Sequence, residues 1–259
     1  MKNELSIIKI GGKIIENEQL LNSFLKNFAR LKGPKILIHG GGKQATELGQ
    51  KLGHETKMNE GRRITSTENL EVITMVYAGL INKNIIAKLQ ASGCNSIGLT
   101  GADANCISAK KRPVVPIDFG WVGDVESVNT DMIQLLLSKN ITPVFCAISH
   151  DGNGQLLNTN ADTVGAEIAI AMSENYETEL IYCFEKDGVL MDVNDELSII
   201  ENITSSSYQK LKLAGVIHAG MLPKIENAFH ALAHNVSKVV IGNANSIIEN
   251  DKKHTQITI

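Results

Sequence analysis

The sequence predicts an α/β fold, a three-layer αβα sandwich around one mostly parallel sheet. Short aliphatic runs at residues 5–10 and 35–38 are each followed by glycines and then by apolar residues at helical spacing. The same alternation of strand and helix resumes after residue 130, which favours a parallel sheet covered on both faces. The 259 residues are 43% hydrophobic, which is enough to fill such a core.

A helix is expected after each of these two runs. Apolar residues recur there at the spacing of one buried helix face, so both helices should pack against the sheet. These residues are Leu21, Phe24, Leu25 and Phe28 in the first helix and Ala45, Leu48 and Leu52 in the second.

A longer helix is predicted next. Thr65 and Glu68 have the spacing of a capping box at its start, and Gly93 lies just beyond its end. Its buried side would consist of Val72, Ile73, Val76, Tyr77, Leu80 and Ile81.

Residues 105–125 change to short alternating segments, which predict a β-hairpin region in the N-terminal lobe. Its segments are 105–109, 114–117 and 122–125. After it we expect helices at 131–137, from 162, at 208–213 and at 223–233, and strands at 143–148, 180–184, 238–241 and 256–259. Because no flexible linker is visible, residues 1–173 and 174–259 are expected to be two lobes that share one continuous sheet.

The composition points to a small-molecule ligand. The formal charge is -3 and no run of like charges stands out, so neither nucleic acid nor a membrane surface is an expected partner. The first apolar stretch is interrupted by Lys9 and is too short for a signal peptide or a membrane span, so a cytoplasmic protein is expected. The four cysteines lack C-x-x-C spacing and should be reduced; they are Cys94, Cys106, Cys146 and Cys183.

Two glycine turns are the best candidate for an anion site. Gly11 and Gly12 follow the first strand and three glycines at 40–42 follow the second, with lysines adjacent to both. A glycine turn that opens a helix presents free backbone N–H groups and the positive end of the helix dipole. A pair of tight turns without a ligand is the alternative explanation.

Several common motifs are absent from the sequence. Neither glycine turn fits the Walker A pattern and no G-x-G-x-x-G follows the first strand, which disfavours a P-loop NTPase and a Rossmann dehydrogenase. No H-E-x-x-H or G-x-S-x-G occurs, so metalloenzyme and serine-hydrolase functions are not expected.

Each of the other candidate polar residues, taken alone, has both a functional and a structural explanation. Asn158, Asn160 and Asp162 lie at a helix start, where capping would explain one of them. Arg63 could bind a substrate carboxylate through two parallel hydrogen bonds, although taken alone a solvated surface arginine is the better explanation. Lys224 lies in the first turn of a helix and indicates nothing alone.

Together these motifs resemble the amino acid kinase family over nearly the whole chain. The segments that carry the resemblance are Lys9-x-Gly11-Gly12, His39-Gly40-Gly41-Gly42, Gly61-x-Arg63, Asn158-x-Asn160-Ala161-Asp162 and Gly220-Met221-x-x-Lys224, with Gly101-x-Asp103 and residues 118–125 in the middle. The resemblance implies that lobe 1–173 binds an acyl-amino acid and forms a homodimer and that lobe 174–259 binds ATP. The implied reaction phosphorylates the γ-carboxylate of N-acetyl-L-glutamate in arginine biosynthesis, with Mg²⁺ carried by ATP and no metal held by side chains.

The resemblance also implies a role for each site residue. Lys9 and Lys224 would neutralise charge on the transferring phosphoryl group, and Asp162 would hold both lysines. Gly11, Gly12, Gly41 and Gly42 would donate N–H groups to phosphate and substrate. Arg63, Asn158 and Asn160 would bind the α-carboxylate and the acylamide. Because the attacking carboxylate is ionised at neutral pH, no general base is required.

Some alternatives stay open at this point. Residues 58–61 lack lysines that the family often has there, so N-succinyl-L-glutamate is a second candidate substrate. Residues 184–188 depart from the family pattern near the nucleotide, which leaves the adenosine contacts undefined and allows a non-catalytic ligand-sensing protein. Kinases for carbamate, glutamate, aspartate or UMP are disfavoured by Arg63 and the two asparagines. Arginine-inhibited members of the family carry an extra helix before the first strand, and here that strand begins near Leu5. The resemblance therefore implies a homodimer that arginine does not inhibit.

Overall fold

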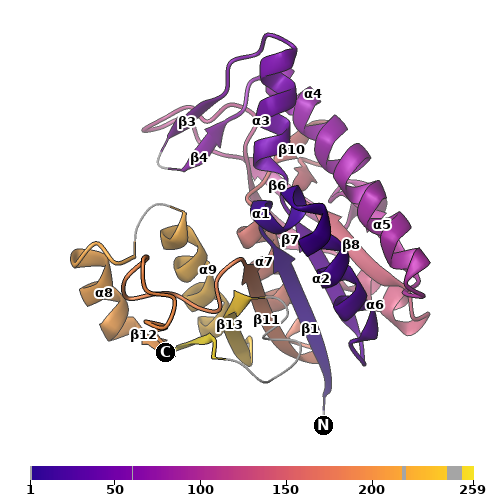
Figure 1. The fold of residues 1–259 in the computed structure, drawn as a ribbon. Coiled ribbons are helices and arrows are strands. Elements are labelled where there is room, and N and C mark those ends of the chain that lie inside the picture. Colours follow the sequence, from indigo (N-terminus) through magenta and orange to yellow (C-terminus); the bar gives the residue numbers. More distant parts are fainter. Residues whose placement is uncertain (1, 60, 218–219, 244–252) are drawn as a thin grey trace.

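The computed structural model describes residues 2–59, 61–217, 220–243 and 253–259 (Figure 1). Within them the main sheet has eight strands, and every neighbouring pair is parallel except the pair β13–β14. In spatial order the strands are β12 (Asn202–Thr204), β14 (Thr255–Thr258), β13 (Lys238–Asn243), β11 (Tyr176–Phe184), β1 (Asn3–Ile10), β2 (Lys35–His39), β8 (Thr142–Cys146) and β5 (Ser96–Leu99). The predicted mostly parallel sheet is confirmed.

Helices cover this sheet, which confirms the α/β layers. The described α-helices are α1 (Gly12–Glu16), α2 (Glu18–Arg30), α3 (Gly42–Lys51), α4 (Thr67–Thr74), α5 (Asn82–Ala91), α6 (Thr130–Ser138), α7 (Ala161–Met172), α8 (Ser205–Leu213) and α9 (Met221–Ala233). Helix α2 packs on α5, and α7 packs on α9 and on the central strands β1, β2 and β11. In Figure 1 the helices of the first half of the chain gather on one side of the molecule and α8 and α9 on the other. The division into two lobes near residue 173 stays a prediction.

Smaller sheets lie beside the main one. One contains β10 (Leu156–Asn158), β9 (Ile148–His150), β6 (Ile107–Lys111) and β7 (Gly123–Val128), and the other is a hairpin of β3 (Lys57–Asn59) and β4 (Arg62–Ile64). The antiparallel pair β6–β7 confirms the predicted hairpin region. The predicted single strand at 143–148 is wrong, because the chain leaves β8 after Cys146 and β9 pairs with β10 instead.

The predicted strand at 114–117 is also wrong. Val114 and Val115 are exposed, and they belong to the connection between β6 and β7. Pro113 and Pro116 flank this pair, and prolines have no N–H to donate to a ladder, so the segment cannot continue the sheet.

The long helix is confirmed, with two corrections. Its cap is Ser66, whose side chain accepts from the N–H of Asn69, because Thr65 is buried and pairs through its backbone with Phe119 and Trp121. The helix runs from α4 to α5 through a π-helical segment, Met75–Ile81. A π-helix adds residues to each turn and rotates the face that follows. Leu80, predicted as buried, is therefore 56% exposed.

Leu52 is a further correction. Helix α3 ends at Lys51, and Leu52 lies at its C-cap with 51% of its surface exposed. The chain then turns at Gly53, whose φ of 81° is left-handed. The apolar pattern that predicted a buried Leu52 therefore extends one residue past the end of the helix.

The continuous helix Thr67–Ala91 is long and apolar enough to cross a membrane by length and composition. Its residues Ile73, Val76 and Ile85 are buried in the same cluster as residues of β1, β2 and β8. Such packing is that of a core helix.

Candidate functional site

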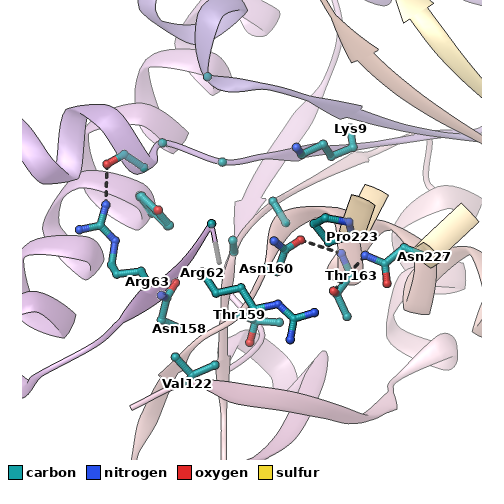
Figure 2. A pocket seen from close by; sticks show the side chains of 18 of the residues that line it. Lys9, Arg62, Arg63, Val122, Asn158, Thr159, Asn160, Thr163, Pro223 and Asn227 are labelled. Atoms are coloured by element: carbon teal, nitrogen blue, oxygen red, sulfur yellow. Dashed lines mark hydrogen bonds between the residues drawn. The ribbon is translucent and has the colours of Figure 1, made fainter. Parts of the chain in front are cut away.

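The carboxyl ends of β1 and β2 lie side by side and carry the two glycine turns. Gly11 is the N-cap of α1 and Gly41 the N-cap of α3, so both turns open helices as predicted. Beside them is a cavity of about 310 Å³ that the β3–β4 hairpin, the end of β10 and the starts of α7 and α9 also line (Figure 2). The sequence motifs, distant along the chain, therefore meet at one cavity.

Lys9, Asp162 and Lys224 form a buried cluster at this cavity. The Nζ of Lys9 lies 2.6 Å from Oδ1 of Asp162, and the Nζ of Lys224 lies 2.8 Å from the same oxygen. The three residues come from β1, α7 and α9 and are each at most 8% exposed. Two cations therefore share one carboxylate, which leaves a net positive charge beside the cavity.

The burial of this cluster perturbs its titration. Burial alone would raise the pKa of Asp162, but the charges and hydrogen bonds of Lys224 and Lys9 hold that pKa well below its ordinary value. Burial lowers the pKa of Lys224 from 10.5 to about 8, against the opposing effect of Asp162. Asp162 is therefore an anion at neutral pH, and Lys224 is close to its titration range.

Tyr182 supports the cluster from the adjacent strand β11. Its hydroxyl donates to the backbone carbonyl of Asp162 at 3.0 Å. The Nζ of Lys224 lies 4.7 Å from the centroid of its ring, a cation–π distance. Lys224 is thus positioned by a carboxylate on one side and an aromatic face on the other.

Three of the four predicted phosphate-binding glycines lie at the cavity. Gly12, Gly41 and Gly42 line the cavity. A side chain at Gly41 would overlap Ile81 and crowd Tyr77, so only glycine allows this close approach of α3 to the long helix.

The predicted role of Gly11 as a phosphate donor needs correction. Its N–H donates to the carbonyl of Cys183 at 3.2 Å, and Gly11 does not line the cavity. The reason is that Gly11 continues the parallel pairing of β1 with β11 beyond the last ladder residues. Its N–H therefore joins two strands of the sheet.

Arg63 lines the cavity from β4 and is anchored to the glycine turn. Its guanidinium donates to the carbonyl of Gly42 and the hydroxyl of Thr46, both at 2.7 Å, and to the hydroxyl of Thr56 at 3.1 Å. An arginine has five N–H donors, so two are left for a ligand. The hydrogen bonds fix the position of the guanidinium beside α3.

The two asparagines have different positions. Asn160 is the N-cap of α7, and its side-chain oxygen accepts from the N–H groups of Asp162 and Thr163. Its capping role, one of the two explanations from the sequence, is therefore present. Asn158 donates through its side chain to the hydroxyl of Thr65 at 3.0 Å. Both asparagines line the cavity, whereas of the buried cluster Lys9 lines it and Asp162 and Lys224 do not.

Sequence reasoning missed two arginines of the cavity, Arg62 and Arg112. Arg112 donates to Asp124 through Nε and Nη2 and lies 5.3 Å from the centroid of the Phe119 ring. Arg62 precedes Arg63 on β4 and has no ion pair with a described residue. The adjacent arginines 62 and 63 were visible in the sequence, but nothing indicated that both would reach one cavity.

Other lining residues could have been found from helical spacing. Asn227 lies three residues after Lys224 on α9 and donates to the hydroxyl of Thr163, which follows Asp162 on α7. Tyr77 lines the cavity from the long helix, and burial raises the pKa of its hydroxyl. Residues three or four positions apart on a helix lie on the same face, so the position of Asn227 relative to Lys224 could have predicted that Asn227 faces the cavity.

A second cavity of about 660 Å³ lies at the carboxyl end of β11. Phe184, Gly188, Val189 and Met191 line it, and so does Lys13, which forms an ion pair with Glu185. Residues 184–188, which depart from the expected pattern, are therefore next to a cavity of mixed apolar and charged character. In the described part of the chain no group of three or more His, Cys, Asp or Glu could hold a metal ion.

Comparison with known sequences places these features in a family context. The family described as "Amino acid kinase family" matches residues 4–243. An acetylglutamate kinase of Cytophaga hutchinsonii is 54% identical over 247 residues, which cover 95% of this chain and 94% of that protein. An acetylglutamate kinase of Bacteroides fragilis is 51% identical over 247 residues, 95% of each chain.

Comparison with solved structures finds the same fold. The N-acetylglutamate synthase of Neisseria gonorrhoeae, solved with coenzyme A and N-acetyl-glutamate, superposes with a TM-score of 0.84 at 20% identity over 100% of this chain and 60% of that one. The carbamate kinase of Giardia superposes with a TM-score of 0.71 at 13% identity over 98% of both chains. At these identities the likeness concerns the fold alone.

Proposed function

This chain belongs to the amino acid kinase family, and we propose that it catalyses the ATP-dependent phosphorylation of the γ-carboxylate of N-acetyl-L-glutamate to an acyl phosphate, a step of arginine biosynthesis. The names of relatives that are 54% and 51% identical over nearly the whole chain support the substrate. The cavity beside Lys9 supports the chemistry, because it combines cations with a helix N-terminus.

The reaction needs charge neutralisation more than proton transfer. An oxygen of the γ-carboxylate attacks the γ-phosphorus of ATP, and the bond from that phosphorus to the oxygen of ADP breaks. The acceptor is already ionised at neutral pH, so no base removes a proton. Two anions must therefore approach each other, and the enzyme has to align them and offset their repulsion.

The residues at the end of β1 are suited to that task. Lys9 and Lys224 both contact Oδ1 of Asp162 and would attract the oxygens of the transferring phosphoryl group. Asp162 would keep both lysines in position before substrate binds, which is the preorganisation that makes electrostatic catalysis effective. Gly12, Gly41 and Gly42 would donate N–H groups on the same side of the cavity.

The acceptor would lie between the hairpin and α7. Arg63 would bind the α-carboxylate with its two remaining donors, and Asn158 would accept from the acylamide N–H. Asn160 would orient the acceptor from the start of α7. In this position the γ-carboxylate faces Lys9.

The nucleotide would occupy the second cavity, in the predicted C-terminal lobe, residues 174–259. Apolar residues such as Val189 and Met191 suit the adenine ring, and Lys13, which directly follows Gly12 in the chain, also lines this cavity. Mg²⁺ would arrive bound to the phosphates of ATP and would neutralise part of their charge.

The residues of lobe 1–173 would bind the acceptor and form the homodimer. A cytoplasmic location and insensitivity to arginine stay predictions.

The observation that carries the proposal is the pair of lysines on one buried carboxylate. A ligand-sensing protein without catalytic function has no electrostatic reason to bury two cations beside one anion, since burying charge costs free energy. Release of ADP separates the two functions. The assay offers N-acetyl-L-glutamate, N-succinyl-L-glutamate, L-glutamate, L-aspartate, carbamate and UMP side by side with ATP and Mg²⁺. We expect release with the acylated amino acid; release with none of the N-acyl-glutamates would favour the sensor.

A further inference from the structure

Given the proposed function, on which this inference rests, we propose that Lys13 binds one of the phosphates of ATP that remain on ADP. Glu185 holds Lys13 in the free protein and is exchanged for that phosphate when the nucleotide binds. The ligand of Lys13 is thus the diphosphate part of an adenine nucleotide, and Lys13 acts in nucleotide binding, apart from the two buried lysines.

Adjacent residues of the chain line the two cavities. Gly12 lines the cavity of about 310 Å³ together with Lys9, and Lys13, the next residue, lines the cavity of about 660 Å³. The proposed nucleotide has its adenine in the larger cavity and its γ-phosphoryl group beside Lys9. The phosphates that join these two groups would run past residues 12 and 13, where Lys13 supplies a cation.

The end of the main sheet brings Glu185 to Lys13. Strands β1 and β11 pair as far as Ile10 and Cys183, and the N–H of Gly11 continues the pairing to the carbonyl of Cys183. Lys13 follows Gly11 by two residues, and Glu185 follows Cys183 by two residues. The Nζ of Lys13 forms an ion pair with Oε1 of Glu185. This pair therefore joins the two segments that leave the sheet at the proposed nucleotide site.

The ion pair is suited to exchange. The side chain of Lys13 is 70% exposed and that of Glu185 is 30% exposed. Ion pairs with such exposure contribute little to stability, because water screens the two charges. Neighbouring phosphates carry more negative charge than one carboxylate and attract an ammonium group more strongly. A nucleotide in this cavity can therefore take Lys13 from Glu185.

Glu185 takes the position of an anionic ligand in the free protein. It lines the larger cavity with Lys13, so its carboxylate oxygen contacts the ammonium group where a phosphate oxygen would. The hydrogen bond and the charge of Glu185 raise the pKa of Lys13. Lys13 is therefore a cation throughout the neutral and mildly alkaline range, in contrast to Lys224, whose pKa is about 8.

Lys186 is the other lysine among the described residues that line the larger cavity. Its Nζ lies 2.6 Å from Oε1 of Glu196, and its neighbours in the chain, residues 185 and 187, do not line the smaller cavity. Of these two lysines, Lys13 is thus the one whose neighbour reaches the site of phosphoryl transfer.

The first test measures the dissociation constants (Kd) of ADP and of adenosine by calorimetry in the presence of Mg²⁺. In Lys13→Met the Kd of ADP should rise about 10-fold, the lower end for hydrogen bonds to charged groups, because Lys13 is exposed. Adenosine has no phosphate, so its Kd should keep the wild-type value. An unchanged Kd of ADP, or an equal loss of affinity for adenosine, would overturn the proposal.

Glu185→Gln tests the exchange, because it removes the charge and keeps the shape of the side chain. ADP should bind up to about 5-fold more tightly, since no exposed ion pair has to be broken. If Glu185 instead positioned Lys13 for the nucleotide, ADP would bind more weakly. Weaker or unchanged binding would therefore contradict the exchange.

Lys43→Met is the matched control. Lys43 directly follows a glycine turn, as Lys13 does, and its side chain is 63% exposed. Its Nζ lies 3.1 Å from Oε2 of Glu16, but Lys43 is not among the described residues that line either cavity. The Kd of ADP should stay at the wild-type value. A loss equal to that of Lys13→Met would show a general effect of positive charge and contradict the contact.

Steady-state kinetics separates this inference from the proposed function. Lys13 would bind the nucleotide equally in the ground state and the transition state, so Lys13→Met should raise KM for ATP about 10-fold and leave kcat unchanged. A lower kcat with an unchanged KM would contradict the proposal. If the wild-type protein released no ADP with any acceptor but the expected order of ADP affinities held, the proposed function would fail and the contact of Lys13 would stand.

Discussion

At the scale of single residues, Lys224 connects structure and chemistry most closely. It is buried, it shares Oδ1 of Asp162 with Lys9, and burial lowers its pKa to about 8. Its charge is therefore positioned before substrate binds and can be removed by a modest rise in pH.

Replacing Lys224 by Met should lower kcat on the order of 10²- to 10³-fold, the cost of losing one preorganised electrostatic stabiliser. Lys9→Met should have a similar effect, because both cations act on the same phosphoryl group. Steady-state kinetics measures the loss, and urea unfolding checks that the variants are folded. Lys26→Met, an exposed change on α2, is the matched control. A Lys224→Met enzyme with the parent kcat would remove Lys224 from the mechanism.

The pH dependence of kcat/KM for ATP should fall above about pH 8. The free protein loses the charge of Lys224 as the pH rises through its lowered pKa, and the neutral amine attracts phosphate less. In Lys224→Arg the guanidinium stays charged, so the remaining activity should not show this decline. A wild-type profile that stays flat to pH 9.5 would contradict the assignment.

The residues of the site were predictable from sequence to different degrees. Lys9, Asp162 and Lys224 were identified only as a set, through family resemblance, because each alone has a simpler explanation. Gly11 was misjudged because a glycine N–H can pair with a neighbouring strand as readily as with an anion. Arg62 and Arg112 were missed because strand β4 and the β6–β7 connection meet only in the folded chain.

At the scale of elements, His39 joins β2 to the long helix. Its Nε2 lies 3.0 Å from the side-chain nitrogen of Asn82, which also donates to the carbonyl of Val144 on β8. Its Nδ1 lies 2.9 Å from the carbonyl of Gly40. Because Asn82 donates to Nε2, the proton of the neutral ring is on Nδ1. This buried network fixes the end of β2, from which the glycine turn starts.

The free energy of unfolding should fall by about 2 kcal/mol between pH 6.5 and 4.5 because of His39. Burial lowers the pKa of His39 from 6.5 to about 4, so over this interval the unfolded state takes up a proton that the folded state does not. Urea titrations at a series of pH values measure the slope. His39→Asn should flatten it, whereas a change at the exposed His234 should not. The same slope in His39→Asn would show that another group is responsible.

Most helices and strands could be predicted from the sequence, because each buries one face and the apolar residues of that face recur at a regular spacing. The errors have local causes. The π-helical segment Met75–Ile81 rotated Leu80 out of the core, and no sequence pattern signals such a segment. The cap moved from Thr65 to Ser66 because the backbone of Thr65 pairs with a distant loop segment, at Phe119 and Trp121.

At the scale of the whole molecule, one sheet connects the acceptor cavity to the proposed nucleotide cavity. Strands β1 and β11 are adjacent and parallel, so Lys9 and the segment after Phe184 leave the same edge of the sheet. The order of strands could not be predicted, because strand signals do not specify neighbours. The two-cavity arrangement follows from that order.

The proposed homodimer should have a mass of twice 28.1 kDa in light scattering. Met75 and Leu80 are large apolar residues exposed on the long helix, and a second copy that packs there would remove them from water. Leu80→Asp should therefore shift the mass toward that of the single chain without lowering the urea midpoint of the monomer. A wild-type protein that is monomeric at micromolar concentration would contradict this proposal.

The central claim, transfer of a phosphoryl group to a carboxylate, is tested most directly by trapping the product. Hydroxylamine converts an acyl phosphate into a hydroxamate, which forms a coloured iron complex and can be identified by mass. With ATP, Mg²⁺ and an N-acyl-L-glutamate we predict the γ-hydroxamate in amounts equal to the ADP released, and a rate of its formation about 10²- to 10³-fold lower with Lys224→Met. ADP release without hydroxamate, or no reaction with either the N-acetyl or the N-succinyl acceptor, would contradict the account.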